Sequence, residues 1–263
     1  MADRRPALFD MILKLRSATP ARIFLPRAGA GLTTRATLDF QLAHAEARDA
    51  VEERLDVDTL FDELTARGLT AVCVRSAARD RRSFLLRPDL GRRLDDESRE
   101  RLKSFAGVYD LAFVIAEGLS ARAIARHALP ILERTLSSLD RTSWKIAPIV
   151  LAEQGRVALG DDIGETLGAR LVAVLIGERP GLSSPDSLGV YLTFAPRVGR
   201  TDAERNCLSN IRPQGLAYDE ATRKLLYLCN EARRRGLTGV ELKDEAETLA
   251  PEGPHAIDVK NEP

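Results

Sequence analysis

The stretch LVAVLIGERPGLSSPDSLGVYLTF, residues 171–194, indicates the fold more strongly than any other part of the chain. Its first apolar run ends at Gly177, and an unbroken apolar run of this length is typical of a strand buried on both faces. A second run, GVYLTFA at 189–195, follows a loop rich in Pro, Gly and Ser and predicts a second strand. Glu178 and Arg179 stand directly after the first strand, where charge requires water, an ion-pair partner or a ligand.

Helices and strands alternate on both sides of this stretch. Short apolar runs predict strands, and segments with apolar residues every three or four positions predict helices. In chain order they are a helix at about 95–105, a strand at 111–116, a helix at about 120–139, a strand at 145–152, a short helix at 161–168, strands at 170–177 and 189–195, and a helix at about 219–235. Strand-helix-strand units favour parallel strands with right-handed crossovers. We therefore predict a doubly wound, mostly parallel, Rossmann-like α/β sheet over residues 69–240.

Residues 1–68 are predicted to form a small helical N-terminal region. The expected helices cover about 6–16, about 34–55 after a cap at Thr33 or Thr34, and about 57–67 before Gly68. The first two helices have no obvious core of their own. They must therefore dock on a partner or pack back on the sheet, and the sequence leaves both possibilities open.

Two further segments border the predicted sheet. The runs LTAVCVRS at 69–76 and RRSFLLRP at 81–88 are rich in strand-forming residues and predict a hairpin or an edge pair of strands. Residues 241–263 are charged and contain prolines, which predicts a flexible tail.

Composition excludes several classes of function. The 39 basic residues balance the 39 acidic residues, so no net field favours nucleic acid or an anionic membrane surface. The longest apolar runs fall far short of the roughly 20 residues that span a bilayer. The 3 cysteines are an odd number without a C-x-x-C pair, which indicates reduced thiols and an intracellular protein.

The polar loops that follow three predicted strands form the candidate site. They contain EGLSARAI at 117–124, EQGRVALGDDIGE at 153–165 and ERPGLSS at 178–184. In an open α/β sheet, ligands bind beyond the carboxyl ends of the parallel strands, where these loops should meet. Ser120 suits either a plain helix cap or an anion site at a helix N-terminus. The motifs G-x-G-x-x-G and G-x-x-x-x-G-K-[ST] are both absent, which argues against a nucleotide-binding enzyme.

The loop GERPG predicts a type II turn, because Pro180 suits the second turn position and Gly181 the third, where φ is positive. This turn leaves Glu178 and Arg179 unexplained. A ligand role for Glu178 stays open, and a structural salt bridge is expected for Arg179.

Cys207 in ERNCLSNI has three possible roles: a nucleophile, a neighbour of a ligand or a small core residue. No histidine lies near it in the sequence to serve as its base. His44, His127 and His255 also lack the spacing of a metal site. We therefore assign neither a catalytic thiol nor a metal centre.

Five blocks of sequence carry a resemblance to a known family. They are RPDLGRRL at 87–94, VIAEGLSARAI at 114–124, GRVALGDDIGETLGA at 155–169, LIGERPGL at 175–182 and NCLSNI at 206–211. In this order they resemble the small subunit of ethanolamine ammonia-lyase, and similarity at the N-terminal side begins near residue 15.

The resemblance implies an adenosylcobalamin enzyme that converts ethanolamine to acetaldehyde and ammonia as a complex of large and small subunits. It places the substrate pocket mainly in the large subunit, while the small subunit completes the cobalamin site, and the cofactor carries the radical chemistry. By resemblance, three residues bind the cofactor: Val157 in GRV, Glu178 in GERPG and Cys207 in NCLSNI. No residue of this subunit is implied to be catalytic.

The chemistry of the cofactor agrees with this assignment. A corrin ring carries amide side chains, and the Glu178 carboxylate can accept hydrogen bonds from them. Cobalamin enzymes that displace the nucleotide base use a D-x-H-x-x-G motif, and no histidine here has Asp two positions before it. We therefore expect base-on binding, as the resemblance also implies.

The resemblance further implies a location in the bacterial cytosol, within a bacterial microcompartment. The N-terminal segment that family members use for packaging is not evident ahead of the first predicted helix. The alternative from a different class is a noncatalytic α/β regulatory or scaffold subunit that binds a small ligand in the same crevice.

Overall fold

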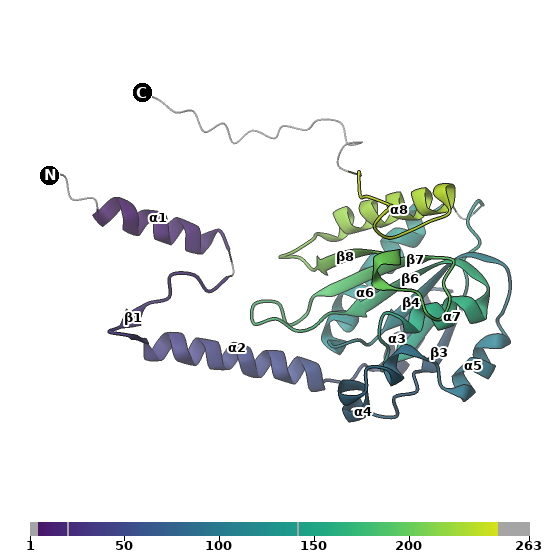
Figure 1. Ribbon diagram of the computed structural model, residues 1–263, viewed down its shortest axis with the longest axis horizontal. Coiled ribbons are helices and arrows are strands. Elements are labelled where there is room, and N and C mark those ends of the chain that lie inside the picture. Colours follow the sequence, from purple (N-terminus) through teal and green to yellow (C-terminus); the bar gives the residue numbers. More distant parts are fainter. Residues whose placement is uncertain (1–4, 20, 141, 247–263) are drawn as a thin grey trace, which may run out of the picture.

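A six-stranded sheet forms the centre of the computed structural model, which describes residues 5–19, 21–140 and 142–246 (Figure 1). The strand order is β3-β5-β4-β6-β7-β8. The strands are β3 Ala71–Arg75, β4 Tyr109–Ala116, β5 Ile149–Glu153, β6 Ala169–Gly177, β7 Leu188–Phe194 and β8 Arg205–Ile211. The first four in this order are parallel, whereas β7 and β8 are antiparallel. The prediction of a mostly parallel α/β sheet is confirmed.

Helices cover both faces of the sheet, as a doubly wound fold requires (Figure 1). One face packs against α3 Val57–Ala66, α6 Ala121–Ser138 and α8 Tyr218–Arg235. The other face packs against α5 Asp96–Lys103 and α7 Leu159–Leu167. Along β4, Leu111 and Phe113 enter the first core and Ala112 and Val114 the second, so the strand is buried from Leu111 to Ala116. This explains its unbroken apolar run.

Small residues let α7 lie close to the sheet. A methyl group at Gly160 would overlap the Val174 side chain of β6, and one at Gly164 would lie 2.5 Å from Cγ of Pro196. The helix ends at Gly168, whose φ of 74° is left-handed. The glycines of the GRVALGDDIGETLGA block therefore set how closely this helix packs on β6.

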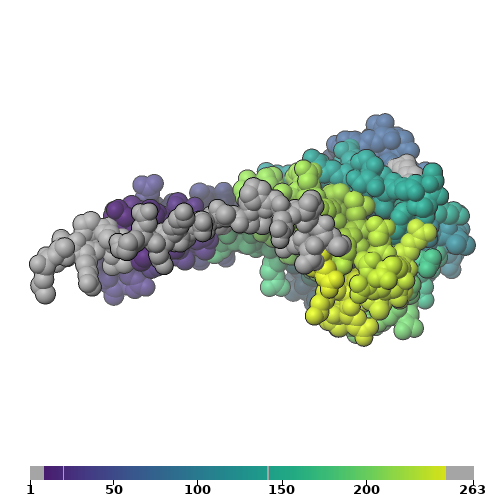
Figure 2. All heavy atoms as spheres, turned by 90° about the horizontal axis from the view of Figure 1, so that it is seen from above, coloured from purple at the N-terminus to yellow at the C-terminus, as the bar shows by residue number. Residues whose placement is uncertain are grey.

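The N-terminal segments form an arm that projects from the α/β body (Figures 1 and 2). The arm comprises α1 Arg5–Ser17, the small hairpin of β1 Arg27–Ala28 and β2 Gly31–Leu32, and α2 Thr34–Glu52. Thr33 caps α2 by accepting a hydrogen bond from the Ala36 amide, as predicted, and the helix ends before Leu55. The following helix, α3, places Leu60 and Leu64 in the core of the body. The predicted division of the chain near residue 68 stays a prediction.

Two strand predictions were wrong or incomplete. Residues 81–86 form the helix α4 Arg81–Leu86 and not a strand, because Asp80 caps its N-terminus and Phe84 is fully buried from that helix. Accordingly β3 pairs with β5 in parallel and not with residues 81–88. Strand β8 was not predicted, because its sequence RNCLSNI is too polar for an apolar run. Short 3-10 turns, Leu90–Arg92 and Asp202–Glu204, complete the described elements.

The start of the predicted tail is packed against the body. Leu242 is buried, and its carbonyl accepts a hydrogen bond of 2.7 Å from the Asn206 side chain of β8. The Ala246 carbonyl accepts one of 2.7 Å from Arg223 of α8. The remaining residues of the predicted tail, 247–263, including His255, lie outside the described residues.

Candidate functional site

A cavity of about 390 Å³ lies beyond the carboxyl ends of β4 and β6. It is lined by residues of the three loops that sequence analysis selected, together with the last two residues of β6 and one residue of β7: Gly118, Leu119, Arg156, Val157, Ile176, Gly177, Glu178, Arg179 and Tyr191. This cavity, called the strand-end cavity below, occupies the position at which open α/β sheets bind ligands.

Two glycines bring the ends of β4 and β6 together under this cavity. Gly118 has a φ of 63°, and the next amide, that of Leu119, donates a hydrogen bond of 2.9 Å to the Gly177 carbonyl. A methyl group at either glycine would overlap backbone atoms across the gap. Any larger residue would therefore push the two strand ends, and the loops they carry, apart.

Glu178 links the end of β6 to the end of β8. Its carboxylate accepts a hydrogen bond from the Ser209 hydroxyl and one of 3.1 Å from the Asn210 main-chain amide. Its own amide donates to the Ser187 carbonyl at 3.0 Å. A carboxylate has about four acceptor positions, so two bonds leave capacity for ligand donors. Sequence analysis missed these two partners, although both lie in the NCLSNI block.

Two predictions about the GERPG loop and Arg179 were wrong. Gly181 does not have a positive φ, so GERPG is not a type II turn. The chain turns instead between Gly181 and Ser184, which exchange two main-chain hydrogen bonds of 3.0 and 3.2 Å. Arg179 is exposed and forms no ion pair with any residue that the structure describes, so the expected salt bridge is absent from the described part.

Cys207 lies on β8 directly opposite Tyr191 of β7. Cys207 is an exposed residue, but partial burial of its sulfur raises the pKa of the thiol, and the charge of Glu178 raises it further, while a hydrogen bond with Tyr191 opposes the rise. Burial also raises the pKa of Tyr191. Cys207 does not line the strand-end cavity but stands behind Tyr191, which does. A thiol with a raised pKa is a poor nucleophile, in line with the absence of a predicted catalytic role.

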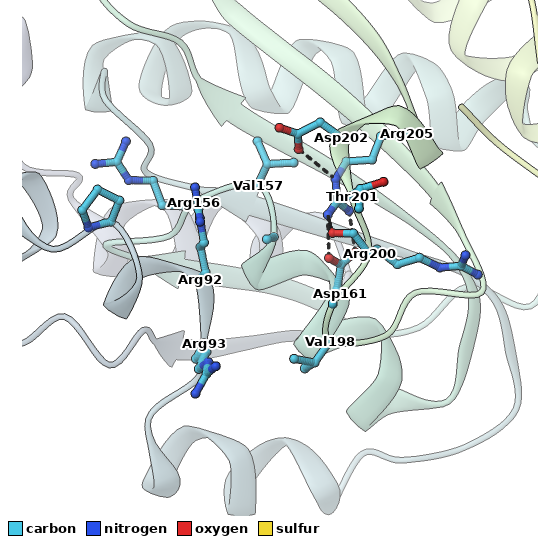
Figure 3. A pocket seen from close by; sticks show the side chains of 13 residues that line it. Arg92, Arg93, Arg156, Val157, Asp161, Val198, Arg200, Thr201, Asp202 and Arg205 are labelled. Carbon is cyan, nitrogen blue, oxygen red and sulfur yellow. Dashed lines mark hydrogen bonds and ion pairs between the residues drawn. The ribbon is translucent and has the colours of Figure 1, made fainter. Parts of the chain in front are cut away.

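Val157 follows β5 and lines the strand-end cavity and a second cavity of about 570 Å³ (Figure 3). The second cavity is rich in arginine, and its lining comprises Pro88, Arg92, Arg93, Arg156, Val157, Ala158, Asp161, Val198, Gly199, Arg200, Thr201, Asp202 and Arg205. We call it the arginine-lined cavity. The structure thus places Val157 and Glu178 in the lining of the strand-end cavity. Cys207 does not line this cavity but is the strand partner of Tyr191, which does.

A buried ion pair supports the floor of the arginine-lined cavity (Figure 3). Arg205 of β8 donates two hydrogen bonds to Asp161 of α7, with Nη1–Oδ1 at 2.6 Å and Nη2–Oδ2 at 2.8 Å. Burial raises the pKa of Asp161, and the bonds from Arg205 lower it. The bond from Arg205 to Thr193 ties β7 to the same pair. Sequence analysis did not find this pair, because the two residues are 44 positions apart.

A second buried pair attaches the arm to the site. Arg81 donates hydrogen bonds to the Val51 carbonyl at 2.7 Å and the Gly118 carbonyl at 2.8 Å, and its Nη1 lies 3.8 Å from the Glu117 carboxylate. Glu117 accepts hydrogen bonds of 3.1 Å from the amides of Leu55 and Gln154. The position of Glu117, directly after a run of apolar residues, could have indicated this pair, because a buried carboxylate requires partners.

Ser120 acts as a helix cap. Its hydroxyl accepts a hydrogen bond of 3.2 Å from the Ala123 amide and donates one of 2.9 Å to the Pro185 carbonyl. The residue is fully buried, so the first of the two possibilities for Ser120 is confirmed. The Pro185 bond also holds the 178–187 loop over the start of α6.

The sheet and the strand-end cavity define an α/β protein of the doubly wound class, with a cavity beyond the carboxyl ends of its parallel strands, where this class binds ligands. The family model described as ethanolamine ammonia-lyase light chain (EutC) matches residues 9–243. The chain belongs to the ethanolamine ammonia-lyase light chain family. The resemblance found in the sequence, and with it the predicted carbon-nitrogen lyase function, is confirmed.

Curated relatives agree with this assignment. The chain is 59% identical over 257 residues to the ethanolamine ammonia-lyase small subunit of Azotobacter vinelandii, covering 96% of this chain and 95% of the relative. It is 57% identical over 245 residues to the same subunit of Pseudomonas aeruginosa strain UCBPP-PA14, covering 92% and 90%. With the subunit of Pseudomonas fluorescens strain Pf0-1 it shares 54% identity over 253 residues, covering 95% and 92%.

The residues around the strand-end cavity fit an amide-fringed ring. Leu119, Val157, Ile176 and Tyr191 provide apolar surface, and Glu178 provides acceptors. In the loop after β5, two buried side-chain atoms lack a hydrogen-bond partner among the described residues: the donor Nε of Arg156 and the acceptor Oε1 of Gln154. Free donors and acceptors beside an apolar wall are what an apolar macrocycle with amide arms requires.

Proposed function

We propose that this chain completes the adenosylcobalamin site of an ethanolamine ammonia-lyase, in complex with its large subunit, for conversion of ethanolamine to acetaldehyde and ammonia. The observation that carries the proposal is the strand-end cavity, where Val157 and Glu178 come together within the segment that the family model matches. The chain contributes binding surface, and the reacting groups of the substrate are handled in the large subunit.

Each cofactor-binding residue has a separate role in this proposal. Val157 offers apolar contact to the ring, and Glu178 accepts hydrogen bonds from its amide side chains. Cys207 supports Tyr191 and makes close, weakly polar contact at the rim. Because Ser209 and Asn210 already hold the Glu178 carboxylate, the acceptor is oriented before the ligand arrives.

When bound, adenosylcobalamin supplies the radical chemistry, and the residues of this chain hold it and exclude water. We further propose base-on binding. Of the described histidines, His44 is exposed on the arm and His127 is buried beside Tyr218, and neither lines the strand-end cavity. The sequence also contains no D-x-H-x-x-G motif.

The arm is proposed to dock on the large subunit. It carries exposed apolar side chains on both helices, namely Phe9, Met11, Leu13, Leu15, Leu38, Phe40 and Leu42. These side chains do not pack back on the sheet, and so many exposed apolar side chains on two helices favour burial against a partner. Within the described residues no helix is long and apolar enough to cross a membrane.

We also propose that the complex works in the bacterial cytosol, within a bacterial microcompartment. Family membership supports this location. Fractionation of cells that express the tagged chain with its large subunit tests it, with co-purification in the shell fraction as the expected result.

The decisive test of the function mixes the purified chain with the large subunit, adenosylcobalamin and ethanolamine. We expect acetaldehyde and ammonia in equal amounts, and no product when either subunit is left out. Base-on binding is tested by loading cobalamin that carries ¹⁵N in its nucleotide base and recording electron paramagnetic resonance of the Co(II) form. A hyperfine pattern altered by the label is expected. If a properly assembled complex makes no acetaldehyde from ethanolamine, the proposed function is refuted.

A further inference from the structure

We propose that three arginines, Arg92, Arg156 and Arg179, bind the phosphodiester in the nucleotide tail of base-on cobalamin. We call them the arginine cluster. The inference rests on the proposed function and extends it, because it assigns an anion site next to the surface proposed for the corrin ring.

The arginine cluster spans the two cavities of the site. Arg156 lines both of them, Arg92 lines the arginine-lined cavity, and Arg179 lines the strand-end cavity. In Figure 3 the side chains of Arg92 and Arg156 lie beside Val157, which also borders both cavities. A ligand whose ring occupies the strand-end cavity can therefore extend a tail past Val157 to reach these guanidinium groups.

Three acids beside the arginine-lined cavity are already paired with other arginines, and Glu178 of the strand-end cavity is held by Ser209 and Asn210. Asp161 and Asp202 both contact Arg205, and Glu204 pairs with Arg200. In contrast, none of the three cluster arginines forms an ion pair with a residue in the described ranges. Glu178 is the one acid among the described residues that line the strand-end cavity, so the three positive charges of the cluster still exceed the negative charge beside them.

Arg156 is held in place without an acidic partner. Its Nη2 donates a hydrogen bond of 3.0 Å to the Phe84 carbonyl, and its guanidinium stacks on the Phe84 ring at 4.2 Å from the centroid. Its amide donates to the Gly91 carbonyl at 2.7 Å, which fixes the loop that carries it. The buried Nε has no partner in the described part of the chain. This geometry leaves a positioned donor that points at no protein acceptor.

The local electrostatics also favour an anion. Burial lowers the pKa of the Arg156 guanidinium, and the like charges of Arg81, Arg92 and Arg179 lower it further. Arg92 and Arg179 are exposed and make no hydrogen bond to a described residue through their side chains. An anion bound among the three would relieve this repulsion and accept charge-assisted hydrogen bonds.

The chemistry of the cofactor selects the phosphodiester as this anion. The amide arms of the corrin ring are uncharged, whereas the tail that carries the nucleotide base contains a phosphodiester with one negative charge. Planar guanidinium groups match the oxygens of a phosphate, and several of them can share it. Glu178 and the arginine cluster would then bind two different parts of one ligand: Glu178 the amide side chains of the ring, and the cluster the phosphodiester of the tail.

The experiment compares three probes on the assembled complex of this chain with its large subunit. Adenosylcobalamin has the whole tail, adenosylcobinamide phosphate has a phosphate without the base, and adenosylcobinamide has neither. Binding is measured by spectrophotometric titration and equilibrium dialysis in the dark, without ethanolamine, so the readout does not depend on turnover. The variants are Arg156→Gln and the double variant Arg92→Gln/Arg179→Gln.

The expected result is a loss of affinity that depends on the phosphate. Arg156→Gln should bind adenosylcobalamin and adenosylcobinamide phosphate about tenfold more weakly, which is the effect of one lost charge-assisted hydrogen bond, and the double variant at least as weakly. Binding of adenosylcobinamide should stay unchanged. Arg170→Gln is the matched control, because Arg170 lies at the opposite end of β6 and is exposed with only a long contact of 3.8 Å to Asp110.

Other outcomes would overturn the inference. Equal weakening for all three probes, or no weakening for any, would exclude a phosphate site while leaving the proposed function intact. A variant could instead fail to associate with the large subunit in size-exclusion chromatography while the ratios between its affinities for the three probes stay those of the wild type. That result would mean that the arginines pair with carboxylates of the large subunit, and it would overturn the inference. If the wild-type complex binds none of the probes, the proposed function fails, and the inference fails with it.

Discussion

The Glu178 carboxylate accepts a hydrogen bond of 3.1 Å from the main-chain amide of Asn210, although the two residues are 32 positions apart. This bond joins the residue that follows the central apolar run to the edge strand β8. A charge at a strand end is thereby oriented by the protein and still has acceptor capacity for a ligand.

Replacing Glu178 should separate binding from folding. Glu178→Ala is expected to weaken adenosylcobalamin binding to the complex by about 1.5–3 kcal/mol, the value of a hydrogen bond to a charged group. Spectrophotometric titration measures it. Glu165→Ala is the matched control, because Glu165 also accepts a main-chain amide bond, of 3.0 Å from Val198, but lies outside the strand-end cavity. Equal titrations for Glu178→Ala and wild type would refute the proposed role.

The thiol of Cys207 should be dispensable for turnover. Burial and the charge of Glu178 raise its pKa, so little thiolate is present at neutral pH. We expect Cys207→Ser to retain most of the acetaldehyde production of the complex, and Cys207 to react more slowly with iodoacetamide than free cysteine. Abolished turnover in a variant that still binds adenosylcobalamin would show that the thiol takes part in the chemistry.

Breaking the buried pair of Asp161 and Arg205 should destabilise the chain strongly. Asp161→Ala leaves the Arg205 charge buried with the exposed Asp202 as its only acidic partner among the described residues, and is expected to lower the free energy of unfolding by about 3–5 kcal/mol. Urea denaturation followed by circular dichroism measures it. The double variant Asp161→Leu/Arg205→Met should recover much of the loss, because it removes both charges. Arg87→Gln, which breaks an exposed pair with Asp89, should have little effect.

The close approach of α7 to β6 predicts a steric effect. Gly160→Ala should lower the free energy of unfolding by about 1–3 kcal/mol, because the added methyl overlaps Val174 in a packed core. Adding Val174→Ala should restore part of the loss. Gly31→Ala is the control, since its methyl would meet only the Ala28 carbonyl at 3.9 Å. Thermal unfolding of the four proteins checks this, and an unchanged midpoint for Gly160→Ala would contradict the packing.

His127 should make stability depend on pH. Burial lowers its pKa from the ordinary 6.5, although Asp186 opposes the shift and Arg126 adds to it. Below about pH 6.5 the unfolded chain therefore binds a proton that the folded chain does not, and the free energy of unfolding falls as pH falls through the folded pKa. Its ring nitrogen Nδ1 lies 2.6 Å from the Tyr218 hydroxyl.

Urea denaturation at pH 8 and pH 5.5 measures this dependence. His127→Gln keeps an acceptor for Tyr218 but cannot titrate, so it should lose less stability between the two pH values than the wild type does. His44→Gln, at an exposed position on the arm, is the control and should follow the wild type. The same loss in His127→Gln and wild type would rule out this histidine as the cause.

Much of the fold could be predicted, because its strands and helices have local signals. The runs that became β4 and β6 are apolar throughout, since both faces of each strand are covered by helices. Thr33 and Ser120 marked helix starts through their capping hydroxyls. β8 was not predicted, because an edge strand is half exposed and its many polar residues leave no clear alternation of apolar and polar positions.

The sequence by itself determined most of the order of strands and helices, but not α4 or β8, together with the loops that form the site and, through five ordered blocks, the family. Only the tertiary structure decided which charges are paired. It joined Glu178 to Asn210 and Asp161 to Arg205, and it left Arg156 and Arg179 without an acidic partner among the described residues. The physical reason is that burial leaves a periodic pattern along the chain, whereas an ion pair needs proximity in space, which residues tens of positions apart acquire only on folding.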